Sequence, residues 1–476
     1  MHRAWSLLLL VSAACAGAPS YRASEIPLPQ TFRETRDTII AMPDTGTALA
    51  DTSWQSVGDS TLTRLINEAV RANLDVRAAE ARVRGARAAR TEASLDLVPT
   101  VTFGAGYTRQ RLSTASFPDV SGPFPDQNIW DGGFDASWEL DLFGRVRHNV
   151  HAQGAFVAVN QEDLRNVRVS LTAELARAYF DLRGAQEQLS VARQNAVNQR
   201  RTLEVTRQRL DAGRGTAFDT ERAQAQLSFT LASVPLFEAR VRQAQYQIGV
   251  LVGRPPAVVA KELDAVAVLP PLPAAVTVDS PDSVVRRRPD VAAAERQLAV
   301  ERALVGAAKA DYLPRITVGA SAGYTATTFD ALGDQGTFRY AVGPIVSWPA
   351  LNLGRVKARV DLSRAREAEA QAQYDQTVLL ALQDVESALV RYRTSRSRVE
   401  RIQDAASASE RAAELARLRF SGGVADFLQV LDAERTQLEA EDQLAQGRTD
   451  AATAYAALYK ALGGAWPTAS GTEVKQ

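Results

Sequence analysis

The amino-acid sequence repeats itself, and this constrains the fold more than any other feature. Segment 138–145, WELDLFGR, resembles WPALNLGR at 348–355, and NLDV at 73–76 matches RPDV at 288–291. Self-similarity at a fixed spacing, here about 210 residues, indicates a duplicated structural unit. We therefore expect a first unit over 61–269, a Pro-rich linker over 270–281 and a second unit over 282–465.

Each unit contains two segments in which apolar and polar residues alternate. They are 100–109 and 131–142 in the first unit, and 315–326 and 337–348 in the second. Strict alternation predicts β-strands with one apolar and one polar face.

Residues 319–323, GASAG, fit the G-x-S-x-G pattern of a hydrolase nucleophile elbow. Such an elbow needs a sharp turn from a strand into a helix. Here the order is reversed, because a helical segment ends near Pro314 and a strand follows. Ser321 therefore falls on the polar face of a strand, and we do not expect an enzyme.

The longest segments are helical. Segments 144–212 and 354–421 contain no proline, and a helix of about 70 residues spans roughly 100 Å. We expect Gly213 and Gly423 to end these helices, since glycine readily adopts the conformation that terminates a helix. A second helix then returns in each unit. Spacings of 4 and 3 predict a coiled-coil seam formed by Val378, Leu382, Val385, Leu389 and Tyr392.

The chain begins with the pattern of an export signal. Residues 1–14 combine a short charged start, an apolar core and small residues, so we exclude them from the fold. Cys15 is the single cysteine, so no internal disulfide can form. Its position resembles the lipobox of bacterial lipoproteins, in which this cysteine carries the lipid. We expect a lipidated, extended segment over 15–60 and a C-terminal tail over 466–476.

Charge and ligand patterns exclude other functions. Basic and acidic side chains number 55 each, so the chain offers no general attraction for nucleic acid. We expect the run Arg286-Arg287-Arg288 to form the surface of a helix junction. His148 and His151 could share a helix face, but no cysteine or carboxylate cluster accompanies them. We therefore expect neither a metal site nor a cofactor.

No segment after the signal approaches the roughly 20 uncharged apolar residues of a membrane helix. If the protein crosses a membrane, it must do so as a closed β-barrel. Four strands cannot close alone, whereas two chains would supply eight strands and three would supply twelve. The polar faces favour three chains, because twelve strands can surround water lined by Asp135, Glu139, Arg315 and Ser321.

Three longer segments carry a family pattern: RRRPDVAAAERQL at 286–298, YLPRITV at 312–318 and RFSGGVADFLQVLDAERTQL at 419–438. They resemble the outer membrane factors of Gram-negative export systems, the TolC-like family, in its lipoprotein (OprM-like, NodT-type) branch. The resemblance implies an α+β membrane protein that forms a homotrimer. A twelve-stranded outer-membrane barrel, four strands per chain, would be continuous with a long periplasmic α-helical barrel.

The resemblance also implies a function and partners. Proteins of this family are passive exit ducts of tripartite pumps, which meet a periplasmic adaptor protein and an inner-membrane transporter. Asp432 matches an acidic position of the ring that narrows the inner end of the channel, and Gln429 lies one turn earlier. Gly213 and Gly423 mark helical tips that the adaptor grips. We expect the neighbouring Glu434 to be exposed.

Two other functions stay open at this point. The same duct could serve a type I protein secretion system rather than the efflux of drugs or small solutes. The chain could also be a periplasmic coiled-coil scaffold without a pore. Such a scaffold, however, has no use for four strands of alternating pattern.

Overall fold

The computed structural model describes residues 26–36, 40–41, 54, 57–113, 124–273 and 276–464. The predicted signal, Cys15 and the predicted tail over 466–476 lie outside the described residues, as does most of the segment 15–60. None of the described helices has both the length and the apolar character needed to cross a membrane.

The chain divides into two compact units, each made of segments that are distant in the sequence. We call these the first and the second unit; they differ from the two sequence repeats, because each contains parts of both. The first unit contains Ala81–Gln161 and Ala293–Asp375. The second contains Ile26–Glu80, Glu162–Ala292 and the chain from Gln376 onward. Four helices contribute residues to both units: α3 (Leu74–Leu95), α4 (Arg145–Asp211), α8 (Pro289–Ala310) and α9 (Leu353–Ser421).

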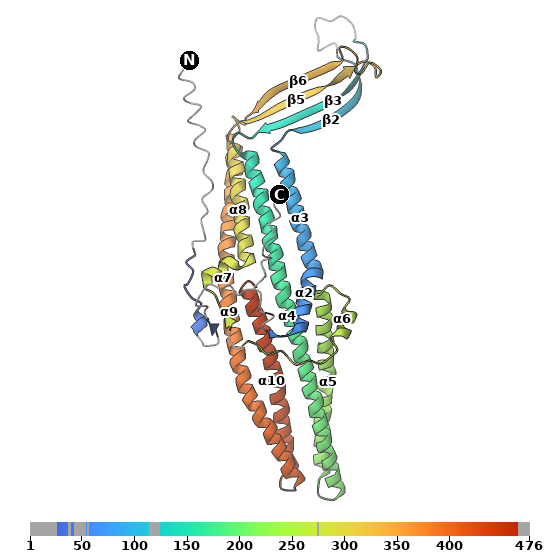
Figure 1. Cartoon of the computed structure of the whole chain (residues 1–476), viewed down its shortest axis with the longest axis vertical. Coiled ribbons are helices and arrows are strands. Elements are labelled where there is room, and N and C mark those ends of the chain that lie inside the picture. The colour runs from blue at the N-terminus through green and yellow to red at the C-terminus, as the bar shows by residue number, and fades with distance from the viewer. Residues whose placement is uncertain are drawn as a thin grey trace. The chain divides into compact units, whose positions relative to one another are not determined.

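The first unit contains an antiparallel sheet of four strands in the order β2-β3-β5-β6 (Figure 1). These are β2 (Thr100–Gln110), β3 (Gln127–Leu140), β5 (Arg315–Ala326) and β6 (Phe338–Ser347). The central pairing, β3 with β5, joins the two halves of the sequence. Within the described chain β2 and β6 form the edges of the sheet.

Alternation in the sequence sorts the side chains onto two faces of this sheet, because successive residues of a strand point to opposite sides. Phe103 lies opposite Phe134 with ring centroids 5.2 Å apart. Tyr324 lies opposite Phe338 with centroids 5.6 Å apart. One face is therefore apolar and largely exposed in the single chain, and the other carries the polar residues.

Glycine is required where the two central strands approach most closely. Gly133 of β3 faces Gly323 of β5. A Cβ atom on Gly323 would lie 2.5 Å from the backbone oxygen of Gly132, and one on Gly133 would lie 2.7 Å from that of Ala322. Any larger side chain would push the strands apart and break the ladder of hydrogen bonds that joins the two halves.

Two tryptophans tie the sheet to the helices that precede it, α3 and α8. Trp138 Nε1 donates to the backbone oxygen of Leu97 at 2.9 Å, and Trp348 Nε1 donates to that of Tyr312 at 3.0 Å. The tryptophans are 210 positions apart (348 − 138) and the acceptors 215 (312 − 97). The same two offsets occur in the sequence repeat, since WELDLFGR and WPALNLGR are 210 positions apart and NLDV and RPDV are 215 positions apart.

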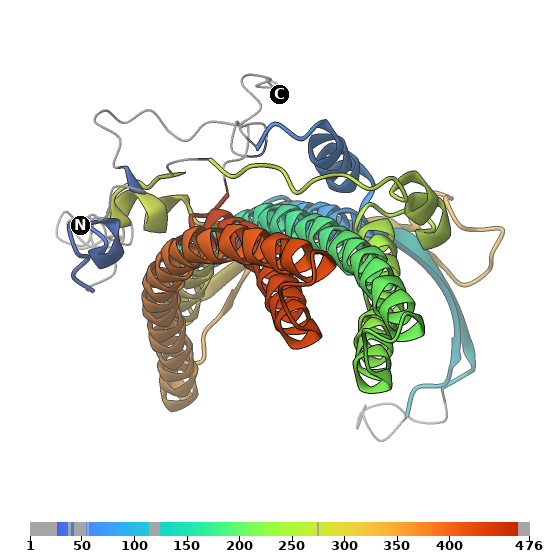
Figure 2. The same ribbon diagram turned by 90° about the horizontal axis from the view of Figure 1, so that it is seen from below.

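The second unit consists mainly of helices. α4 and α5 form one antiparallel hairpin, and α9 and α10 form another, which lies beside it (Figure 2). Besides α4 and α9, its elements are α2 (Ser60–Ala72), α5 (Ala217–Leu251), α6 (Pro256–Glu262), α7 (Pro281–Arg287) and α10 (Phe427–Ala461). The short elements η1 (Arg33–Arg36), β1 (Ile40–Ala41) and β4 (Val276–Thr277) complete it, with β1 and β4 paired in parallel.

The main core lies where α2, α4, α5, α9 and α10 of this unit meet. Tyr179 of α4 and Leu62 of α2 are fully buried, and Leu458 of α10 is 1% exposed. The coiled-coil seam predicted on α9 faces this core, since Val385 and Leu389 are also fully buried. The 3.5-residue period of that seam thus identifies the side of α9 that packs inward.

A half-buried hydrogen bond joins α2 to this core. Asp59 caps α2, because its Oδ1 accepts from the backbone N–H of Thr61 at 2.8 Å and from that of Leu62 at 3.0 Å. Its Oδ2 accepts from the hydroxyl of Tyr179 at 2.5 Å. Burial, and then the hydrogen bond to Asp59, raise the pKa of Tyr179 to about 12. The hydroxyl therefore stays protonated and joins α2 to α4.

Candidate functional site: the polar sheet face and the helical tips

The polar face of the sheet brings together the four residues predicted to line water. Asp135 of β3 lies directly opposite Ser321 of β5, and Glu139 lies near Arg315 at the helix end of the same face. Ser321 occupies the middle of β5 and pairs with Ala341 of β6 on its other side. It is at no turn, so the geometry of a nucleophile elbow is absent from this described strand.

An ion-pair cluster lies at the helix end of this face. We define the junction cluster as Glu139, Arg145, Asp311, Arg315 and Arg359. Glu139 accepts from Arg145 at 2.9 and 2.6 Å, and Asp311 contacts both Arg315, at 3.2 Å, and Arg359, at 3.3 Å. Arg315 and Glu139 are 3.8 Å apart, which connects the two groups. The cluster links β3 and β5 to α4, α9 and the end of α8.

Each long helix ends at a glycine with a left-handed backbone. Gly213 follows α4 with a φ of 69°, and Gly423 follows α9 with a φ of 78°. In each case the backbone N–H of the residue after the glycine donates to the carbonyl oxygen of the residue five positions before it. The N···O distance is 2.8 Å after α4 and 2.9 Å after α9. This is the Schellman arrangement, in which glycine is favoured because it has no Cβ. The two glycines therefore define the helical tips.

The two tips contact each other through Arg209. Its guanidinium lies over the ring of Phe420, 4.0 Å from the centroid, and donates to the backbone oxygen of the same residue. Phe420 in turn packs against Phe427 of α10, with ring centroids 5.9 Å apart. The repeat in the sequence did not predict this contact between the hairpins.

The two residues predicted to form the periplasmic aperture lie on α10, close to the second tip. Asp432 and Gln429 are both exposed in the single chain. The backbone N–H of Gln429 donates to Oδ1 of Asp426 at 3.0 Å, which caps α10. The aperture itself would need further copies of the chain, so the role of both residues is taken up as a proposal below.

The prediction that Glu434 is exposed is wrong. The residue is 4% exposed, accepts from Thr202 Oγ1 of α4 at 2.6 Å, and lies 3.4 Å from Arg417 of α9. It faces inward because it follows the buried Phe427 and Val430 at helical spacings of seven and four residues. Glu434 thus joins three helices rather than standing at the surface.

Glu434 belongs to a series of polar contacts that the sequence analysis missed. We define the polar ladder as three α4 residues spaced by seven, each bonded to an acid of α10. Gln188 donates to Asp442 at 2.8 Å, Asn195 donates to Glu441 at 2.7 Å, and Thr202 donates to Glu434. The seven-residue spacing of polar side chains on α4 was the available signal in the sequence.

The prediction of a surface role for Arg286, Arg287 and Arg288 is wrong for the last of them. Arg286 has an exposed side chain, whereas Arg288 is 7% exposed. Arg288 donates to Asp290 at 2.7 Å, and to the backbone oxygen of Ala461 at 3.0 Å. It connects the start of α8 with the end of α10, a structural role in the second unit.

His148 lies against α8 instead of standing in a metal-binding group. A Cβ atom on Gly306 would lie 2.6 Å from the ring of His148, so the glycine makes room for the imidazole. Burial, and then the charge of His151, lower the pKa of His148. In the part of the chain that the structure describes, no group of three or more His, Cys, Asp or Glu side chains could hold a metal ion.

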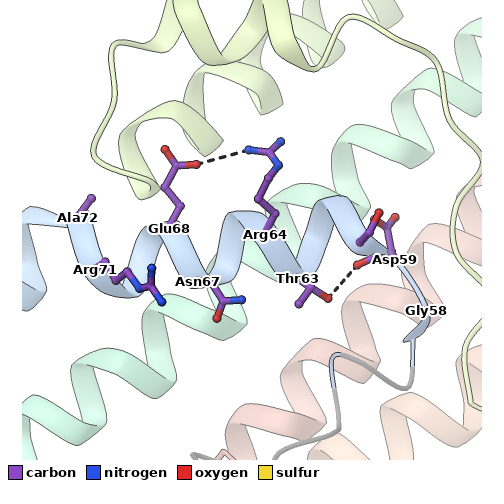
Figure 3. A pocket seen from close by; sticks show the side chains of 9 residues that line it. Gly58, Asp59, Thr63, Arg64, Asn67, Glu68, Arg71 and Ala72 are labelled. Atoms are coloured by element: carbon purple, nitrogen blue, oxygen red, sulfur yellow. Dashed lines mark hydrogen bonds and ion pairs between the residues drawn. The ribbon is translucent and has the colours of Figure 1, made fainter.

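The groove along α2 shows no arrangement suited to catalysis. It has a volume of about 770 Å³ and is lined by Gly58, Asp59 and seven residues of α2 (Figure 3). Thr63 donates to the backbone oxygen of Asp59 at 2.9 Å, and Arg64 pairs with Glu68 at 3.5 Å. Its side chains come from one helix and its cap, and they do not converge from several elements on one point.

Comparisons with known proteins agree with this geometry. The family model "Outer membrane efflux protein" matches residues 65–254 and 281–464. The chain is 29% identical to the outer membrane protein OprJ of Pseudomonas aeruginosa, over 97% of this chain and 95% of OprJ. It is 26% identical to the probable outer membrane lipoprotein SilC of Salmonella typhimurium, over 97% and 98% of the two chains. The solved outer-membrane channel OprN is 36% identical, covers 94% of this chain and 99% of its own, and superposes with a TM-score of 0.87.

Proposed function

This chain belongs to the outer membrane efflux protein family, and from that premise we propose how it works as an outer-membrane duct. It is the outer-membrane component of a tripartite efflux system, with transport rather than catalysis as its task. We propose that it gives drugs or small solutes a passive exit from the periplasm to the exterior. The observation that carries this proposal is one sheet with a polar face, an exposed apolar face and two edges in the described chain.

Three copies would close this sheet into a barrel of twelve strands. Backbone groups at a sheet edge cannot remain unpaired in lipid, so β2 of one copy would pair with β6 of the next. A contact that joins two different edges of identical chains is heterologous. Such contacts close into a ring when the rotation from each chain to the next divides a full turn evenly. The polar faces would then surround water lined by Asp135, Glu139, Arg315 and Ser321.

The helices would form the periplasmic wall of the same trimer. Apolar residues remain exposed on α5, including Phe229 at 73% and Leu236 at 65%. On α9, Leu379 is 54% exposed and Leu415 is 60% exposed. Contact between α5 of one copy and α9 of the next would bury both sets, which supports a ring of helical hairpins. The family model matches two separate segments, 65–254 and 281–464, which supports an internal two-fold sequence repeat over 61–269 and 282–465.

The ends of the duct would serve anchoring and coupling. A lipid on Cys15 would attach the mature N-terminus to the outer membrane. The tips at Gly213 and Gly423 would meet a periplasmic adaptor protein, which connects the duct to an inner-membrane transporter. Three copies of Asp432, with Gln429 one turn away, would form a negatively charged constriction at the periplasmic aperture. A duct for type I protein secretion would share this architecture, but the match to the outer membrane efflux protein family favours solutes.

The mass of the detergent-solubilised protein tests the assembly. We expect light scattering, corrected for detergent, to give a trimer of about 150 kDa from a precursor chain of 51.5 kDa, because only a closed ring leaves no sheet edge in lipid. Circular dichroism on the same sample checks that the protein is folded. A monodisperse monomer with the expected helix content would contradict the shared barrel.

A further inference from the structure

Two arginines stand at the loop end of the sheet, on its apolar side. Arg109 shares a face with Tyr107, because residues two apart on a strand point the same way. Arg111 follows β2, and both guanidinium groups contact Asp126, at 2.9 Å from Arg109 and 2.5 Å from Arg111. These three described side chains together carry a net charge of +1 (2 − 1).

The arginines come directly after an aromatic pair. The rings of Tyr107 and Trp130 are 4.6 Å apart, and the hydroxyl of Tyr107 donates to Asn128 at 3.0 Å. Further along the same face lies the purely apolar pair of Phe103 and Phe134. Apolar, amphipathic and cationic side chains thus follow one another toward the loop end. In membrane barrels, Trp and Tyr mark the boundary between hydrocarbon and headgroups.

We propose that Arg109 and Arg111 form a binding site for the phosphate groups of lipids in the outer leaflet of the membrane. This inference rests on the proposed function, which places the sheet in the outer membrane. The helices leave the sheet at its other end, so the loop end would point to the exterior. Guanidinium groups bind phosphate through paired, charge-assisted hydrogen bonds, which suits this ligand.

The geometry leaves the arginines available for a ligand. Their side chains are 66% and 61% exposed, whereas Asp126 is 37% exposed. A guanidinium has five N–H donors, and the single carboxylate of Asp126 accepts only some of them. Asp126 therefore holds the two cations side by side and leaves most of their N–H donors without a bond to its carboxylate.

The neighbouring apolar strip favours a lipid over free phosphate. Acyl chains attached to the phosphate group would lie against Phe103 and Phe134, whose side chains are exposed in the single chain. Inorganic phosphate would gain nothing from that strip. The other loop, 327–337, carries Asp330 and Asp334 and no basic residue, so it offers no comparable pair of arginines.

Lipid binding by the purified full-length protein tests the proposal. The probe is lipid A with its phosphate groups, titrated in detergent and followed by native mass spectrometry. We expect the double variant Arg109→Gln/Arg111→Gln to bind it roughly 20- to 30-fold more weakly, about five-fold for each arginine near an anionic headgroup. Dephosphorylated lipid A should not distinguish the double variant from the natural protein.

Arg339→Gln is the matched control. Arg339 lies near the same end of the sheet but on the polar face, where it pairs with Asp131 at 2.6 Å. This variant should bind phosphorylated lipid A as the natural protein does. Equal binding by the double variant, or an equal loss in the control, would overturn the proposal. Competition by inorganic phosphate as effective as that of lipid A would also overturn it, because the acyl chains would then contribute nothing.

The two proposals fail in different ways. If the natural protein is monomeric or does not insert into liposomes, the duct is wrong. If trimers form and insert normally, but the double variant binds lipid A as strongly as the natural protein does, only the headgroup site is wrong.

Discussion

At the scale of single residues, Arg288 and Asp290 show how charge is held inside the second unit. The side chain of Arg288 is 8% exposed, and that of Asp290 is 31% exposed. Burial raises the pKa of Asp290, but the hydrogen bonds and positive charge of Arg288 lower it by more, so its pKa lies below the usual range. Asp384 also contacts Arg288, at 3.1 Å, so the cation keeps a second partner.

Replacing Asp290 with asparagine should destabilise the protein in a pH-dependent way. We expect Asp290→Asn to lower the free energy of unfolding by about 2–3 kcal/mol at neutral pH, since Arg288 loses one charged partner. The pKa is lowered in the folded state, so this stabilisation is present above the unfolded pKa, near 4, and is lost as the pH falls through the folded pKa. Denaturant unfolding at several pH values measures it. A difference that stays constant from pH 7 to pH 3 would contradict the assignment.

Glu434 gives a second residue-scale prediction. Glu434→Ala removes the acceptor of Thr202 and a partner of Arg417 in a buried position, so we expect a loss of roughly 2 kcal/mol in the free energy of unfolding. Glu439, which is exposed five residues later on α10, is the control. Glu439→Ala should change stability by less than about 0.5 kcal/mol. Equal effects of the two substitutions on thermal or denaturant unfolding would show that Glu434 is not a buried link.

At the scale of elements, periodicity was sufficient to find the four strands and the long helices. The alternation of Val101, Phe103 and Tyr107 specifies one face of β2, and the seam that includes Val385 and Leu389 specifies the inner side of α9. Both patterns arise because one whole face of a strand or helix is apolar. The spacing of apolar residues in the sequence shows this directly. The ends of the long helices could also be predicted from the sequence, because the left-handed backbone at such an end favours glycine.

The polar contacts between elements could not be predicted in the same way. Thr202 and Glu434 are 232 positions apart, and nothing local in either segment identifies the other as its partner. Arg288 is similar, because a run of three arginines gives no sign of which one turns inward. Each of these bonds depends on how two helices are aligned, and that alignment follows from packing across the whole unit. The lumen residues followed from strand alternation, whereas the aperture and the adaptor contact at the tips came from family resemblance. All of these roles remain proposals.

At the scale of the whole molecule, the chain is an outer-membrane protein whose barrel and lipid anchor would contribute separately to membrane attachment. We expect Cys15→Ser to abolish labelling by a radioactive fatty acid. The protein should still reach the outer membrane, because the apolar band of the barrel supplies affinity of its own. Fractionation of labelled cells measures both properties. Absence of label in the natural protein would refute the lipid anchor, and loss of the variant from the membrane would refute the independent role of the barrel.

Single-channel recording in a planar bilayer tests the duct most directly. Three copies of Asp432 would place like charges around the narrow end, where they attract divalent cations. We therefore expect inserted trimers to give discrete conductance steps, with larger steps and weaker block by periplasmic divalent cations for Asp432→Ala. Glu439, seven residues or roughly 10 Å further along the same face of α10, is the control, and Glu439→Ala should match the natural protein. If inserted trimers of both the natural protein and Asp432→Ala leave the bilayer without conductance steps, the chain does not form a water-filled duct.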